Sequence, residues 1–64
     1  MDHQRVLTEK YLINQIESKR NYYLAIVYNE ELPYHERQIA NAAVKELTKI
    51  LHYKICELNS LVNE

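Results

Sequence analysis

The sequence predicts an all-α protein, an antiparallel two-helix hairpin, and three observations support this prediction. Residues 39–62 repeat apolar side chains at spacings of three and four, the period of one face of an α-helix. The residues before this segment are mostly good helix formers, and the single proline, Pro33, stands between the two segments. A connection this short forces the two helices to lie antiparallel.

The first helix is expected at about residues 8–31. Thr8 is a suitable N-cap, and Glu9 places an acid in the first turn, where the helix dipole favours negative charge. Residues 2–7 then form a short polar lead-in. The segment 22–28, YYLAIVY, favours strands by composition, but a lone strand has nothing to pair with. We therefore expect a helix end there that is buried on more than one side.

The turn is expected at residues 31–34, because the residue before a proline is pushed out of the helical region. Pro33 is well tolerated at the first position of a helix, so the second helix is expected at about residues 33–62. Glu36 lies in its first turn. Residues 63–64 form a frayed tail.

The core seam between the helices is expected to contain apolar residues that share one face of each helix. The predicted members are Leu12, Ile16, Tyr23 and Ile26 on the first helix, and Ile39, Ala43, Leu47, Ile50, Leu51 and Leu58 on the second. Ala40, Ala42 and Ala43 form a small-residue patch opposite the bulky segment 22–28, where large side chains would pack against small ones. The alternative is a groove kept open for a partner.

The whole chain, residues 1–64, is expected to form one hairpin domain whose stability depends on a partner. A domain this small buries only about 60% of the surface that its unfolded chain exposes. A single cysteine excludes an internal disulfide, and no Cys/His cluster has zinc spacing. Apolar residues also lie outside any single seam: Val6, Leu7, Tyr22, Leu24, Tyr28, Val44, Tyr53 and Ile55. We expect a homodimer that buries them in a four-helix bundle, with Tyr22, Tyr28, Val44, Tyr53 and Ile55 as candidate interface residues.

Composition excludes several classes of function. The net charge of −1 argues against a nucleic-acid partner, and no apolar run approaches the roughly 20 residues needed to span a membrane. The N-terminal residues lack the pattern of a signal peptide, so we expect a cytoplasmic protein. The absence of glycine excludes a P-loop, a dinucleotide fingerprint and a nucleophile elbow.

No group of side chains predicts a catalytic or metal site, and no cofactor is expected. The three histidines lie in the lead-in, near the turn and in the second helix, and no two are one helical turn apart: His3, His35 and His52. Cys56 lies beside the apolar stripe of the second helix, and we expect a small buried side chain there. Glu30 and Glu31 end the first helix, where the dipole disfavours acids. We interpret them as solvent-exposed, with a basic partner as the alternative.

The first helix contains the pattern Ile16-Glu17-x-Lys19-Arg20 followed by tyrosine. Over residues 12–51 the chain resembles a family of small helical hairpins from spore-forming bacteria, which remove the phosphate from an aspartate of a sporulation response regulator. The resemblance implies a hairpin and a response-regulator partner. The family's signature, Ser-x-x-x-Asp on the second helix, falls on Asn41 and Lys45, and Lys45 reverses the charge of the acid. The resemblance therefore supports the hairpin and leaves the phosphatase activity unsupported.

The expected function is a small non-enzymatic protein-interaction module that regulates or chaperones a partner protein. A divergent member of the phosphatase family, acting in sporulation control as an enzyme or as a docking inhibitor, is the second hypothesis. The chain is also similar in layout to the small co-chaperones of type III secretion needle subunits, which are hairpins with an alanine-rich second helix. A dimeric hairpin that binds nucleic acid through Lys45, Lys49 and His52 is a further alternative.

Overall fold

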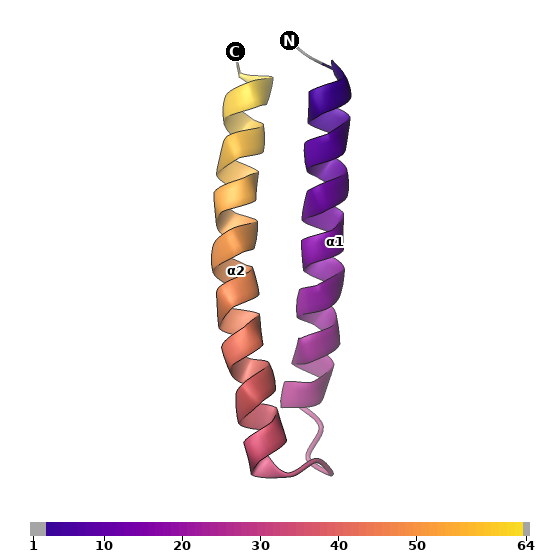
Figure 1. Ribbon diagram of the computed structural model, residues 1–64, viewed down its shortest axis with the longest axis vertical. Coiled ribbons are helices and arrows are strands. Elements are labelled where there is room, and N and C mark those ends of the chain that lie inside the picture. The colour runs from indigo at the N-terminus through magenta and orange to yellow at the C-terminus, as the bar shows by residue number, and fades with distance from the viewer. Residues whose placement is uncertain (1–2, 64) are drawn as a thin grey trace.

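The computed structural model describes residues 3–63 and shows two antiparallel helices side by side (Figure 1). Helix α1 spans His3–Val27 and α2 spans Tyr34–Val62, and no strand occurs between residues 3 and 63. The hairpin is a rod of 48 × 15 × 11 Å, with the turn at one end and both termini at the other. The predicted all-α hairpin is confirmed, including the helix over residues 22–27. The lead-in residue Asp2 and the tail residue Glu64 lie outside the described residues.

Helix α1 begins at His3, five residues before the predicted N-cap. The Thr8 hydroxyl donates a hydrogen bond to the Gln4 carbonyl at 3.0 Å, which is how a threonine inside a helix satisfies its side chain. Val6 is only 7% exposed, so the first turns of α1 are packed against α2. This buried valine stabilises a helical start that the polar residues around it do not suggest.

Helix α1 ends at Val27, before the acids that the sequence places in it. The Asn29 amide donates to the Ile26 carbonyl at 3.2 Å, three residues back, which tightens the last turn. The Asn29 side-chain oxygen accepts a hydrogen bond from the Glu31 amide at 3.1 Å, forming an Asx turn. Asn29 therefore ends the helix, through a local bond that competes with the helical one.

Helix α2 begins at Tyr34, with Pro33 as its N-cap rather than its first helical residue. Pro33 has φ −59° and ψ 147°, an extended backbone, and its carbonyl accepts a hydrogen bond from the Arg37 amide at 3.2 Å. The helix ends at Val62, as predicted. The boundary at the turn thus shifts by one residue, because proline supplies the carbonyl of the first helical hydrogen bond.

The seam between α1 and α2 follows an unbroken alternation of spacings of three and four on both helices, the pattern typical of coiled coils. Its residues, all buried or half-buried, are Val6, Glu9, Ile13, Ile16, Arg20, Tyr23 and Val27 on α1, and Arg37, Ala40, Val44, Leu47, Leu51, Lys54, Leu58 and Leu61 on α2. Four of them form the buried core: Val6, Ile13, Ala40 and Leu51. Of the small-residue patch, only Ala40 is buried, at 3% exposure.

The predicted seam is rotated toward one side of the hairpin. Leu12, Ile39 and Ile50 are wrong as seam residues, because they are 37%, 59% and 44% exposed. Ile26 and Ala43 are half-buried at the edge of the seam. Five predicted residues do lie in it: Ile16, Tyr23, Leu47, Leu51 and Leu58. The error has a physical cause, because each misplaced residue stands directly before an apolar seam residue and apolar spacing alone fits both positions. The seam residues beside Leu12, Ile39 and Ile50 are Ile13, Ala40 and Leu51.

The segment 22–28 is not buried on more than one side. Tyr22 is 66% exposed and Tyr28 is 78% exposed, whereas Tyr23 and Val27 are half-buried at the seam. The Tyr22 and Tyr23 rings meet edge to face, with centroids 5.3 Å apart. A hairpin has only one inner side, so Leu24 and Ile26, which flank the seam residues, are only half-buried, and Tyr22, Ala25 and Tyr28 are exposed.

Candidate functional site

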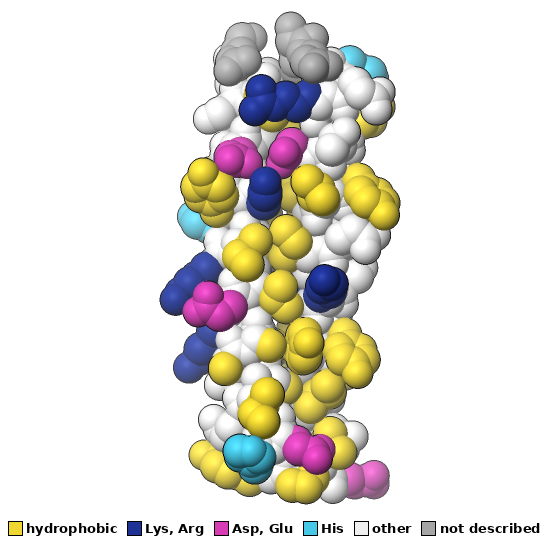
Figure 2. Space-filling model, in the orientation of Figure 1, with side chains coloured by type: hydrophobic (Ala, Val, Ile, Leu, Met, Phe, Trp, Pro, Cys, Tyr) yellow, Lys and Arg dark blue, Asp and Glu magenta, His cyan; other side chains and the backbone are white. Residues whose placement is uncertain are grey.

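The apolar face of the hairpin is one of the two broad sides that a pair of helices leaves uncovered. It consists of Leu12 and Ile26 on α1 and Ile39, Ala43 and Ile50 on α2. Each of these residues directly precedes a seam residue. In an antiparallel pair, the residues that precede the seam positions lie on the same side of both helices. Figure 2 shows apolar side chains gathered along the middle of the rod over both helices.

The apolar face is hollowed close to the turn. The hollow is lined by Tyr23, Ile26, Leu32, Glu36, Ile39 and Ala40. Ile26 of α1 and Ile39 of α2 therefore lie at the same level of the rod. Glu36 is the one charged residue of this lining, so the surface offered there is almost wholly apolar.

The end of the rod near the termini is charged. Lys54 Nζ lies 3.7 Å from Glu9 Oε2 on the other helix and 3.4 Å from Glu57 Oε2 on its own. The side chains of Glu9 and Lys54 are 15% and 28% exposed, so this ion pair is partly removed from water. Arg5 and Glu57 line one hollow together with Tyr53. Charges of both signs are thus grouped at this end, as Figure 2 shows.

The polar face lies on the opposite side, where residues directly follow the seam positions. Over its middle it carries Lys10, Asn14, Glu17 and Asn21 on α1, and Asn41, Lys45, Thr48 and His52 on α2. The two family-signature positions are therefore neighbours here, one turn apart: Asn41 is half-buried and Lys45 is exposed. Neither side chain is an acid, and Lys45 brings a positive charge to the position.

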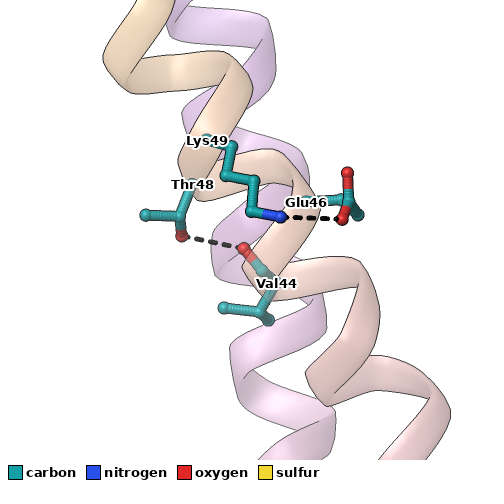
Figure 3. A network of polar contacts seen from close by, with 4 residues as sticks. All are labelled: Val44, Glu46, Thr48 and Lys49. Atoms are coloured by element: carbon teal, nitrogen blue, oxygen red, sulfur yellow. Dashed lines mark hydrogen bonds and ion pairs between the residues drawn. The ribbon is translucent and has the colours of Figure 1, made fainter.

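The outer side of α2 carries local polar contacts (Figure 3). Lys49 Nζ lies 3.5 Å from Glu46 Oε1, and both side chains are well exposed. Glu46 therefore partly neutralises the charge of Lys49. The Thr48 hydroxyl donates to the Val44 carbonyl at 2.8 Å. Lys45, Lys49 and His52 share one side of α2, but Glu46 balances the positive charge of Lys49 there.

The turn tip comprises Tyr28, Glu30, Glu31 and Tyr34. Tyr28 and Tyr34 are 78% and 69% exposed, and the two acids between them are exposed as well. Because α1 ends at Val27, Glu30 and Glu31 lie in the connection and not in the last helical turn where the sequence places them. The tip combines two aromatic rings with two negative charges at one end of the rod.

The candidate interface residues differ in how far their side chains are exposed. Tyr22, Tyr28, Tyr53 and Ile55 are 66%, 78%, 63% and 38% exposed, so their side chains are accessible. Val44 is wrong as an outward-facing residue, because it is half-buried at a seam position. Sequence reasoning also misses Ile39 and Ile50 as surface residues, since it assigns them to the seam.

Cys56 is exposed and not the small buried side chain that the sequence suggests. Its Sγ lies 3.9 Å from Nε2 of His52, one helical turn earlier, a pairing that the spacing of four could have revealed. Within residues 3–63, no group of three or more His, Cys, Asp or Glu side chains could hold a metal ion. Neither helix, over the same residues, has the length and apolarity required to span a membrane.

Comparison with known proteins gives no match to a family model, to a curated protein or to a solved structure.

Proposed function

We propose that this protein is a small protein-interaction module that binds a partner protein through its turn tip and thereby regulates or chaperones that partner. One observation carries the proposal: large apolar side chains from both helices and the turn are 37–78% exposed, whereas the buried core found between residues 3 and 63 consists of four residues. Contiguous exposed apolar surface on a soluble protein is typical of binding sites.

The chemistry of the turn tip indicates the kind of partner. Tyrosine supplies a large contact area and a hydroxyl group, and it is enriched among the residues that dominate binding energy. Glu30 and Glu31 add negative charge between Tyr28 and Tyr34. The tip therefore fits a partner segment that presents lysine or arginine next to an apolar side chain.

A second candidate function rests on the polar face. The signature positions of the phosphatase family, Asn41 and Lys45, are one turn apart on this face. A lysine cannot replace an acid that acts on a phosphoryl group. A family member with Asn41 and Lys45 would therefore bind a response regulator without the activity that the acid of the signature supplies. Under this alternative, the regulator would contact the polar face and not the turn tip.

Affinity capture with cross-linking, from a lysate of the source organism, tests the proposal. The wild type is compared with Tyr28→Ala/Tyr34→Ala and with the control Tyr11→Ala, whose tyrosine is 62% exposed on α1. We expect the same specific protein with the wild type and the control, and its loss with the double variant. A response regulator retained by the double variant would favour the second candidate. Nucleic acid that is lost steeply with added salt, or no specific protein at all, would overturn the proposal.

A further inference from the structure

We propose that the apolar face binds a second copy of this chain, and that the resulting four-helix bundle has both turns at the same end. This inference concerns a different surface from the turn tip and does not depend on the proposed function. Both helices contribute apolar residues to the face: Leu12, Ile26, Ile39, Ala43 and Ile50. Charged residues lie around them on the same side, including Lys19 between Leu12 and Ile26.

The exposed area of the chain indicates that one copy leaves an interface uncovered. The hairpin exposes 5,057 Å², whereas a compact protein of 7.7 kDa exposes about 4,300 Å². The excess, about 700 Å², is close to the roughly 800 Å² that each partner buries in a stable interface of standard size. The radius of gyration is 14.8 Å, against about 11 Å for a compact chain of this length. A second hairpin on one broad side would remove this excess.

The contacts between α1 and α2 fix which residues lie at the same level of the rod. Glu9 pairs with Lys54 at 3.7 Å, and Ile26 lines one hollow with Ile39. The residue numbers sum to 63 in the first pair and to 65 in the second. The numbers of Leu12 and Ile50, like those of Arg5 and Glu57, sum to 62, so each pair lies within about one helical turn of the same level, and Arg5 and Glu57 line one hollow. Leu12 and Ile50 lie at the end of the apolar face that is farther from the turn.

Two symmetric arrangements of a second hairpin are available. With a two-fold axis along the rod, both turns share one end and α1 lies against α2 of the second copy. The levels are then preserved, so Leu12 meets Ile50 of the second copy and Arg5 meets Glu57 of the second copy. Apolar residues pack on apolar residues, and opposite charges face each other.

With the axis across the rod, the turns lie at opposite ends and each helix lies against its own copy. When the rods overlap fully, Leu12 then comes near Lys19 of the second copy, and Glu36 comes near Glu57 of the second copy. The α1 edge of the face carries Arg5 and Lys19, whereas the α2 edge carries Glu36, Glu46 and Glu57. This arrangement places like charges together, which disfavours it.

The same-end dimer has a consequence for the turn tips. It places the two tips side by side at one end of the bundle, so that a partner with two binding segments would meet both. Linked sites of this kind bind with higher avidity than one site alone.

Sedimentation equilibrium at micromolar concentration tests the interface. We expect twice the monomer mass for the wild type, and the monomer mass for Leu12→Glu/Ile50→Glu, with a dissociation constant raised at least about 100-fold. The control Tyr11→Glu carries its new charge on the outer side of α1 and should remain dimeric, as should Tyr28→Ala/Tyr34→Ala. A strictly monomeric wild type, or a double glutamate variant that dimerises as the wild type does, would overturn the proposal.

Electron spin resonance distances test the arrangement without altering the apolar face, so they remain decisive if the glutamate variant does not fold. A spin label is attached at Glu31→Cys in a Cys56→Ser chain. We expect a distance between labels below about 30 Å, because packed helices lie about 8–10 Å apart and both turns share one end. A distance near the 48 Å length of the rod would show turns at opposite ends and would contradict the proposal.

Discussion

Glu9 of α1 and Lys54 of α2 form an ion pair across the seam, with Lys54 Nζ 3.7 Å from Glu9 Oε2. Both residues occupy positions where a coiled coil ordinarily places apolar side chains. Oε2 of Glu9 is buried and makes no hydrogen bond that meets the usual distance limit, so it depends on the lysine charge. The pair links the helices, but removing its charges from water offsets much of the attraction.

We predict that replacing both partners stabilises the hairpin while replacing one destabilises it. Lys54→Met leaves the Glu9 carboxylate partly buried and unpaired across the seam, and should lower the free energy of unfolding by about 1–3 kcal/mol. Glu9→Leu/Lys54→Met should equal or exceed the wild type by about 1 kcal/mol, because apolar seam residues replace the charges. Urea unfolding followed by circular dichroism, at one fixed protein concentration, measures both. A double variant weaker than Lys54→Met would show that the ion pair stabilises the fold on balance.

Leu51→Ala is expected to destabilise the hairpin more than Leu47→Ala does. Leu51 is 6% exposed and Leu47 is half-buried, so the first substitution leaves the larger cavity. The Leu51 variant should lose about 2 kcal/mol or more, which is a large part of the stability of so small a domain. Thermal melts compared with Tyr11→Ala, expected within about 0.5 kcal/mol of the wild type, provide the measurement. Equal melting temperatures for the two leucine variants would contradict the difference in burial.

The two helices and the turn are predictable from the sequence, because the signals for them are local. Pro33 marks the connection and the apolar spacing marks α2. The helix ends are less predictable. Asn29 ends α1 through its own side chain, and Val6 extends α1 toward the N-terminus by packing against α2. That packing depends on a contact between distant segments, which no local pattern contains.

The rotation of the seam was not predictable from apolar residues alone. Glu9, Arg20, Arg37 and Lys54 occupy seam positions, and apolar residues on α1 are spread almost evenly around the helix. Nε of Arg20 and Nε of Arg37 are buried without a hydrogen-bond partner, which shows how far both arginine side chains pack into the seam. The two broad faces of the hairpin are defined by the residues before and after each seam position, so they cannot be assigned until the seam residues are known. Only the structure therefore shows that Leu12, Ile26, Ile39 and Ile50 share one face of the hairpin, although the sequence shows that each is apolar.

Thr8→Ala separates the two descriptions of the start of α1. If Thr8 were the N-cap, its loss would cost about 1 kcal/mol. Because Thr8 lies inside α1 and bonds back to Gln4, alanine should leave the stability unchanged or raise it by up to about 0.5 kcal/mol. Thr48→Ala is the matched control, since Thr48 makes the same bond to Val44 inside α2. A decrease of about 1 kcal/mol in the free energy of unfolding for Thr8→Ala, but not for Thr48→Ala, would show that Thr8 does cap the helix.

Cys56 should react with a thiol reagent in the folded protein. Its side chain is exposed on α2, so an aromatic disulfide reagent can reach Sγ without unfolding. We expect Cys56 to react in buffer at a rate within about tenfold of its rate in 8 M urea, after correction for the effect of urea on the reagent itself. A buried thiol would react only after unfolding, which would slow the reaction by more than about 100-fold even for a hairpin of about 3 kcal/mol stability.

Cys56→Ser supplies the blank for this measurement, and His52→Ala shows whether the imidazole 3.9 Å from Sγ alters the rate. A reaction in buffer that follows only the unfolded fraction would mean that Cys56 is covered in solution, and that the surface around it belongs to an interface.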